Sequence, residues 1–284
     1  MTRPAYDRDV SELRPRRRPT RTVRLRRTIA VAILVGAVSA VVGASIALSP
    51  REDSRPTPQA STPSPSATTT PTPSATPTST PAPTFDSSAQ SIDDPASYWV
   101  VVNKQRPLNP EGFYPADLRA PQVPYEAYEQ RADAATAIEQ MFATFLQETG
   151  LEMESISGFR SYDSQVSIYN GWVNSLGQEQ ADLVSARPGH SEHQTGLAID
   201  IGSIPAHCSL EECFSETTQA QWGAANAYRF GFILRYPADK TAITGYAYEP
   251  WHFRYVGVDL ATEMNNQGIT TLEEYFGLPA APTY

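Results

Sequence analysis

The chain contains very little cysteine. Its 284 residues include two, Cys208 and Cys213, separated by four residues. Two nearby cysteines on the outer side of a membrane are expected to form a disulfide. The alternative is a Cys-x4-Cys zinc pair joined by His207, but no second Cys or His pair at suitable spacing completes four ligands. The sequence therefore favours a disulfide over a structural zinc site.

Charge is absent between residues 28 and 48, a stretch of 21 mostly apolar residues. About 20 apolar residues span a bilayer. Ten arginines and three acidic residues give residues 1–27 a formal charge of +7, whereas the whole chain carries −9. Because the arginines adjoin the apolar stretch, they indicate a cytoplasmic tail and a transmembrane helix rather than a nucleic-acid partner. The alternative is a protein secreted after signal cleavage, because Ala44, Ser45 and Ala47 are small enough for a cleavage site.

Large apolar residues are absent from residues 49–84, which are mostly Pro, Thr, Ser and Ala. Such a segment cannot bury a core, and Pro-rich chains stay extended at about 3.1 Å per residue, so this one could reach roughly 100 Å. We expect a disordered linker that holds the following residues away from the membrane.

Residues 85–284 have the length of one folded domain. An apolar stripe at helical spacing, from Ala134 to Phe145, predicts a helix over 131–149 that Gly150 ends. A second helix is expected after the turn at 158–161, capped by Ser161 or Asp163, with Ile168, Trp172 and Ser175 on one side. Further helices are expected at 178–184, 218–229, 257–267 and 271–276, and strands at 98–102, 153–157, 197–201, 232–236 and 251–256.

The run from Leu197 to Ile201 alternates like a half-buried strand, with Asp200 on the face opposite the large apolar residues. An unpaired buried carboxylate is costly, so Asp200 needs a partner. His193 is close enough in sequence to return to it through a turn at Gly196. This stretch therefore predicts half of a metal site.

The predicted strand at 251–256 supplies the other half. A catalytic zinc takes three protein ligands from His or carboxylate and keeps one position open. His193, Asp200 and His252 provide that set, although the four histidines of the chain allow other triples. Glu249 lies three residues before His252 and is free to act as a base. Arg160, at a strand-to-helix junction, is either the cation for a carbonyl oxygen that gains negative charge or part of a surface salt bridge.

Three blocks of sequence carry a resemblance to a known family. Residues 157–165 read S-G-F-R-S-Y-D-S-Q, residues 191–200 read S-E-H-Q-T-G-L-A-I-D, and residues 249–257 read E-P-W-H-F-R-Y-V-G. These blocks resemble the motifs of the VanY-type D-alanyl-D-alanine carboxypeptidases, zinc peptidases whose fold is related to those of lysostaphin and the hedgehog domain. The resemblance covers roughly residues 98–262. It implies an α+β fold in which helices pack on a small antiparallel sheet.

The resemblance also implies Zn²⁺ as cofactor and peptidoglycan stem peptides as substrate, from which the C-terminal D-alanine is removed. The alternatives are an endopeptidase of the same fold and a non-catalytic cell-wall-binding domain, although the latter should have lost a ligand or the base. Cleavage of a D,D or an L,D bond stays open. The implied roles are zinc ligation by His193, Asp200 and His252, base catalysis by Glu249, carbonyl binding by Arg160, and substrate binding by Gln165, Ser191 and Trp251.

Overall fold

The computed structural model describes residues 85–284. The predicted basic tail at 1–27, transmembrane helix at 28–48 and linker at 49–84 lie outside these residues. Within 85–284, no helix is both long enough and apolar enough to cross a membrane.

A four-stranded sheet forms the centre of the domain. Its strand order is β3 (Glu152–Ser157), β4 (Ala198–Ile204), β6 (His252–Tyr255) and β5 (Phe232–Leu234). Every neighbouring pair is antiparallel. A second sheet joins two short strands, β1 (Leu118–Arg119) and β2 (Gln130–Arg131). The predicted α+β class with a small antiparallel sheet is therefore confirmed.

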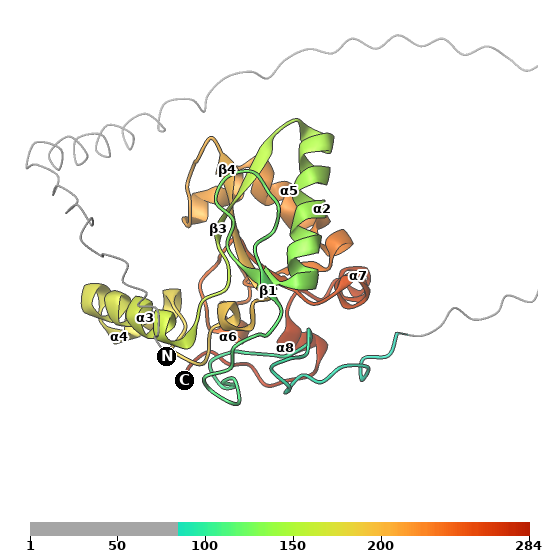
Figure 1. Cartoon of the computed structure of the whole chain (residues 1–284). Helices are drawn as coiled ribbons and strands as arrows, with labels where there is room; N and C mark the ends of the chain where they lie inside the picture. The colour runs from blue at the N-terminus through green and yellow to red at the C-terminus, as the bar shows by residue number, and fades with distance from the viewer. Residues whose placement is uncertain (1–84) are drawn as a thin grey trace, which may run out of the picture. The chain divides into compact units, whose positions relative to one another are not determined.

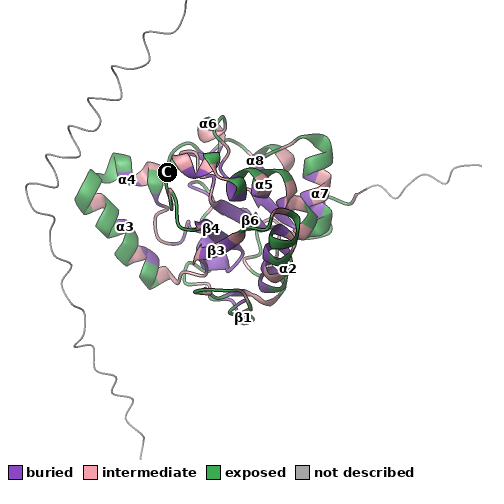
Figure 2. Cartoon of the chain, turned by 90° about the horizontal axis from the view of Figure 1, so that it is seen from above, coloured by how far each residue is buried: buried purple, intermediate pink, exposed green. Residues whose placement is uncertain are grey.

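Helices surround the central sheet unequally. In Figure 1, α2, α5 and α7 lie together beside the sheet, whereas α3 and α4 form a separate pair on the other side. Figure 2 shows that β4 and β6 are buried, while much of α3 and α4 is exposed. The helices are α2 (Ala132–Thr149), α3 (Tyr162–Leu176), α4 (Gln178–Val184), α5 (Thr218–Asn226), α6 (Thr241–Thr244), α7 (Val258–Gln267) and α8 (Leu272–Tyr275), with 3₁₀ turns η1 (Glu192–Thr195), η2 (Glu212–Glu216) and η3 (Ala227–Phe230).

The main core lies between α2 and the sheet. The predicted stripe of α2 is buried there, and Gly150 ends the helix with a φ of +73° and an amide that donates to the carbonyl of Leu146. The large apolar residues of the stretch 197–201 enter the same core from β4. Because successive strand residues point to opposite faces, Asp200 faces away from this core.

The strand predicted at 98–102 is wrong. The segment is buried and its side chains do alternate, with Val100 and Val102 in one apolar cluster and Trp99 and Val101 in another. No strand of the described residues pairs with it. Instead, the guanidinium of Arg254 donates to the carbonyls of Tyr98 and Val100, at 3.1 and 2.6 Å. The alternation therefore reflects burial in two clusters rather than a ladder of backbone bonds.

The predicted disulfide is confirmed, since Cys208 and Cys213 are bonded to each other in the loop after β4. The alternative zinc pair with His207 is wrong, because neither sulfur remains as a thiolate ligand.

Gly196, which ends η1, provides a test of the turn between His193 and Asp200. Its φ is +67°, and an added Cβ would lie 2.9 Å from Cδ2 of Leu118 and 3.1 Å from Cγ of Arg131. Gly268 has the same φ but open space around it. Gly268→Ala should lower the free energy of unfolding by about 1–2 kcal/mol, the cost of the left-handed conformation. Gly196→Ala should cost about 1–3 kcal/mol more because of overpacking.

Chemical denaturation of the two variants measures this difference. Equal losses of stability would show that the space around Gly196 relaxes without cost.

Candidate metal centre

Three elements bring the predicted metal ligands together. His193 lies in η1, Asp200 in β4 and His252 at the first position of β6. The register of β4 against β6 places Asp200 directly opposite His252. Gly196, in the left-handed conformation, turns the chain from η1 into β4. As a result, one ligand atom from each of the three buried side chains lies within 4.8 Å of the others.

The two imidazoles face Asp200 through different nitrogens. Nε2 of His193 lies 3.3 Å from Oδ2 of Asp200, whereas Nδ1 of His252 lies 3.2 Å from Oδ1. The other nitrogen of His193, Nδ1, is 2.8 Å from the carbonyl oxygen of Gly158. A carbonyl only accepts, so this contact places the hydrogen on Nδ1 and leaves the lone pair of Nε2 directed at the cluster.

The donor set fits a zinc ion. Two imidazole nitrogens and one carboxylate oxygen are the ligands of many catalytic zinc sites. Oδ1 of Asp200 is buried and has no hydrogen-bond partner, because its approach to His252 lacks hydrogen-bond geometry. A buried carboxylate oxygen left in this state is costly, and a cation held among the three side chains would satisfy it.

The electrostatics of the cluster keep Asp200 ionised. Burial opposes its charged form, but His193 and His252 lower the pKa of Asp200 well below its usual value. Burial lowers the pKa of His193, against the attraction of Asp200. At His252 burial also acts downward, but the neighbouring carboxylates of Asp200 and Glu192 raise its pKa to about 9. Asp200 is therefore an anion at the point where a cation would bind.

Glu249 and Arg160 flank the three ligands. Oε2 of Glu249 lies 3.6 Å from Nδ1 of His252, and burial raises the pKa of Glu249 to about 7. The guanidinium of Arg160 donates to Oε1 of Gln165 at 2.9 Å and to Oγ of Ser157 at 3.0 Å. Burial lowers the pKa of Arg160, against the attraction of Asp200 and Glu249. These bonds aim a fixed cation toward the cluster.

A cavity of about 420 Å³ opens over this cluster. Its floor is polar, and its walls carry apolar side chains that remain partly exposed. The wall residues from α3, α4 and the disulfide loop are Ile168, Trp172, Val184 and Leu210, with exposed fractions of 38%, 42%, 41% and 45%. The sequence placed Ile168 and Trp172 on one side of a helix. Only the structure shows that this side faces the cavity.

The residues predicted to bind substrate lie in two different environments. Ser191 and Trp251 line the cavity. Gln165 does not, because its side chain is fully buried behind Arg160. Its amide donates to the carbonyl of Ala186 at 2.6 Å while its oxygen accepts from Arg160. The structure therefore gives Gln165 the task of holding Arg160 in place.

Two further histidines lie outside the cluster. Nδ1 of His190 is 2.8 Å from the carbonyl oxygen of Asn103, and His207 is exposed in the disulfide loop. Sequence reasoning missed Glu192, which lines the cavity beside His193. Its position inside the S-E-H block was the available signal.

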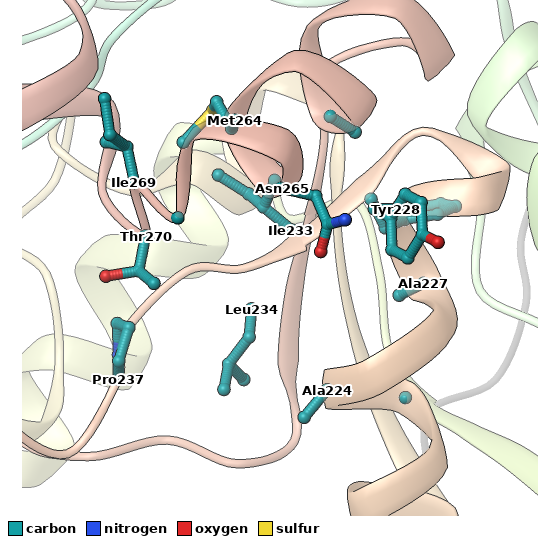
Figure 3. Close-up of a pocket in the computed structure, with 14 residues that line it drawn as sticks. Ala224, Ala227, Tyr228, Ile233, Leu234, Pro237, Met264, Asn265, Ile269 and Thr270 are labelled. Carbon is teal, nitrogen blue, oxygen red and sulfur yellow. The ribbon is translucent and has the colours of Figure 1, made fainter.

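A separate cavity of about 190 Å³ lies between α5, β5 and α7, with mostly apolar walls (Figure 3). None of the predicted site residues lines it. The metal centre is therefore confined to the larger cavity.

Comparison with known proteins agrees with this geometry. The family model VanY, described as D-alanyl-D-alanine carboxypeptidase, matches residues 128–258. The protein YodJ of Bacillus subtilis is 42% identical over 193 residues, which cover 66% of this chain and 70% of YodJ. The chain belongs to the VanY family. The family match spans all three sequence blocks and most of the described residues.

Two solved structures show the fold of VanY relatives. The LD-carboxypeptidase LdcB is 42% identical, with a TM-score of 0.59, over 64% of this chain and 87% of LdcB. A variant of the D,D-pentapeptidase VanY from a VanB-type resistance cassette, solved in complex with Zn(II), is 32% identical, with a TM-score of 0.52, over 62% of this chain and 97% of that protein. The cofactor of this VanY-family chain is therefore zinc, and the cluster of His193, Asp200 and His252 could hold it.

Removing the carboxylate should abolish tight metal binding. In Asp200→Asn, the neutral amide loses the attraction that holds a cation between the imidazoles. We expect the dissociation constant for Zn²⁺ to rise by more than the roughly 100-fold that loss of an outer-shell partner costs. Competition with a chromophoric chelator measures the change.

Asp182→Asn is the matched control. Asp182 forms a 2.8 Å salt bridge with Arg187 and does not line the cavity. If both variants bind Zn²⁺ as the unaltered chain does, the cluster is not the metal site.

Proposed function

We propose that this protein is a zinc carboxypeptidase that removes the C-terminal D-alanine from peptidoglycan stem peptides. The observation that carries the proposal is the convergence of the His193, Asp200 and His252 cluster with Glu249 and Arg160 on one cavity. A non-catalytic wall-binding domain would have no need for a base and a fixed cation beside its metal ligands. The VanY family model and LdcB are both described as carboxypeptidases, which supports the same reaction class.

Each residue has a separate task in the proposed reaction. His193, Asp200 and His252 hold the zinc, which when bound acidifies water and polarises a carbonyl group. Glu249 takes the proton from the attacking water and returns it to the departing amine of D-alanine. Arg160 donates hydrogen bonds to the carbonyl oxygen as negative charge develops on it.

The shape of the cavity suits a peptide with an exposed end. The apolar walls from α3, α4 and the disulfide loop would cover the stem peptide, while Ser191 and Trp251 lie near the polar floor. The solved relatives include an LD-carboxypeptidase and a D,D-pentapeptidase. Both tetrapeptide and pentapeptide stems are therefore substrates to be tested.

The proposed location follows from the sequence. We place residues 1–27 in the cytoplasm, residues 28–48 in the membrane, and residues 85–284 as a zinc carboxypeptidase domain outside it, reached through the linker at 49–84. Peptidoglycan lies on that side of the membrane, so this topology brings the cavity to its substrate. Secretion after signal cleavage would deliver the domain to the same compartment.

The catalytic base provides the first test. In Glu249→Ala, loss of proton transfer should lower the rate of D-alanine release by about 10²–10⁴-fold. The zinc content should remain stoichiometric, because Glu249 is not one of the three ligands. Incubation of the full-length protein with tetrapeptide and pentapeptide stems, followed by mass spectrometry, measures both the rate and the bond that is cut.

Glu148→Gln is the control, because Glu148 forms an exposed salt bridge with Arg229 away from the cavity. Loss of a fragment larger than one alanine would favour the endopeptidase alternative. Stoichiometric zinc without hydrolysis of any muropeptide would favour the wall-binding alternative. Full activity in Glu249→Ala would contradict the proposed mechanism.

Arg160 provides the second test. Lysine keeps the charge in Arg160→Lys but loses the fork of donors that Gln165 and Ser157 hold in position. We expect kcat to fall about 10²–10³-fold, as when one oxyanion donor is lost, with zinc affinity unchanged. Steady-state kinetics on the preferred stem peptide measure the change, and Arg187→Lys, outside the cavity, is the control. An equal fall of kcat in both variants would mean that Arg160 affects the reaction only through the stability of the fold.

A further inference from the structure

Glu192 is fully buried beside the metal centre and divides its two oxygens between different partners. Oε1 accepts from Nε of Arg235 at 2.8 Å and from Nη1 of Arg254 at 2.7 Å. Oε2 has no hydrogen-bond partner and lies 3.5 Å from Nε2 of His252, which also has none. Two buried polar atoms without partners therefore face each other across a gap that a small movement would close.

The other edge of the same imidazole faces the carboxylates of Asp200 and Glu249. Nδ1 of His252 is 3.2 Å from Oδ1 of Asp200 and 3.6 Å from Oε2 of Glu249. A neutral imidazole carries hydrogen on one nitrogen and a lone pair on the other. To present the lone pair of Nδ1 to a metal, His252 must carry its hydrogen on Nε2. A carboxylate at Nε2 favours that arrangement, because it accepts and cannot donate.

The arrangement at His252 matches the one at His193. There the outward nitrogen, Nδ1, faces the carbonyl oxygen of Gly158 at 2.8 Å, and the lone pair of Nε2 points toward Asp200. Each imidazole thus has an acceptor on the nitrogen that points away from the cluster. Hydrogen bonds of this kind fix the tautomer and the ring orientation of metal-binding histidines.

The surroundings of Glu192 prevent it from turning away. Arg235 is held on its far side by Glu273, through bonds of 2.9 and 2.8 Å. Arg254 is anchored to the carbonyls of Tyr98 and Val100. The side chains of Glu192, Glu273 and both arginines are fully buried. Moving four charged side chains out of water costs free energy, and a protein with hydrophobic side chains of similar volume in their place would often be no less stable.

We propose that Glu192 is a positioning residue, which accepts a hydrogen bond from Nε2 of His252 and so directs Nδ1 of that ring to the zinc. The two arginines hold Glu192 at the distance this requires. Because Glu192 and His193 are neighbours in η1, one short turn orients both imidazoles. The proposal rests on the role of His252 as a zinc ligand under the proposed function.

Glu192→Gln tests the proposal, since its amide keeps an oxygen for the arginines but presents a donor to Nε2 of His252. The ring must then move its hydrogen to Nδ1 or rotate, and we expect the dissociation constant for Zn²⁺ to rise about 10–100-fold. The second readout is the imidazole ¹H–¹⁵N spectrum of the zinc-loaded full-length protein. It should lose the exchange-protected Nε2–H signal of His252.

Glu273→Gln is the matched control. Glu273 binds the same Arg235 and is equally buried, but it binds Asn103 rather than a histidine. Both substitutions should lower the melting temperature, because both disturb the buried charges. Only Glu192→Gln should weaken zinc binding and change the His252 signal.

The results for these variants distinguish a positioning role of Glu192 from a purely structural one. Equal zinc affinities in Glu192→Gln and Glu273→Gln, with the His252 signal retained, would overturn the proposal. If Glu192→Gln does not fold, Glu192→Asp replaces it, since aspartate keeps the charge but is one methylene too short to reach the arginines and His252 together. It should also weaken zinc binding. Unchanged zinc affinity in His252→Ala would refute the ligand set itself, and with it the proposed function.

Discussion

The pairing of β4 with β6 is the constraint on which the rest of the site depends. Its register sets Asp200 opposite His252, so two of the three candidate metal ligands are joined by the backbone bonds of the sheet. On the other face of β4, Leu197, Ile199 and Ile201 fill the core. A shift of one residue would bury the carboxylate among them. The hydrophobic core therefore holds the geometry of the metal centre, and rigid strands rather than loops carry two of its ligands.

A buried ionic network lies next to the metal centre on the same sheet. Arg254 follows His252 by two residues on β6, and Glu192 precedes His193 in η1, so the network and the metal centre share the same two elements. Such networks contribute little net stability, because desolvation offsets the attraction between charges. What they contribute is orientation: each charge has one geometry in which its partners are satisfied. Arg254 also binds the segment 98–102, which ties the start of the domain to the site.

Much of the local structure could be predicted from the residues. The stripe of α2, its terminal Gly150 and the alternation of β4 appear where the sequence pattern places them. Of the two candidate caps of α3, Ser161 and Asp163, the structure uses Ser161. The grouping of His193, Asp200 and His252 and the disulfide were predictable as well. The segment 98–102 was not, because alternating burial without a neighbouring strand has the same sequence pattern as a strand. Gln165 was assigned to the cavity because its position in the motif does not show which way its side chain points.

The sequence by itself therefore determined most of the helices and the strands of the central sheet, the chemistry of the candidate metal ligands, and the choice between a disulfide and a thiolate zinc site. These depend on spacing and residue type, which are local. Only the tertiary structure decided which nitrogen of each histidine faces Asp200, that Gln165 supports Arg160, and that Ile168, Trp172 and Leu210 line one cavity. It also revealed Glu192 between two arginines and His252. These relations join residues far apart in the chain, and their geometry exists only once the core has packed.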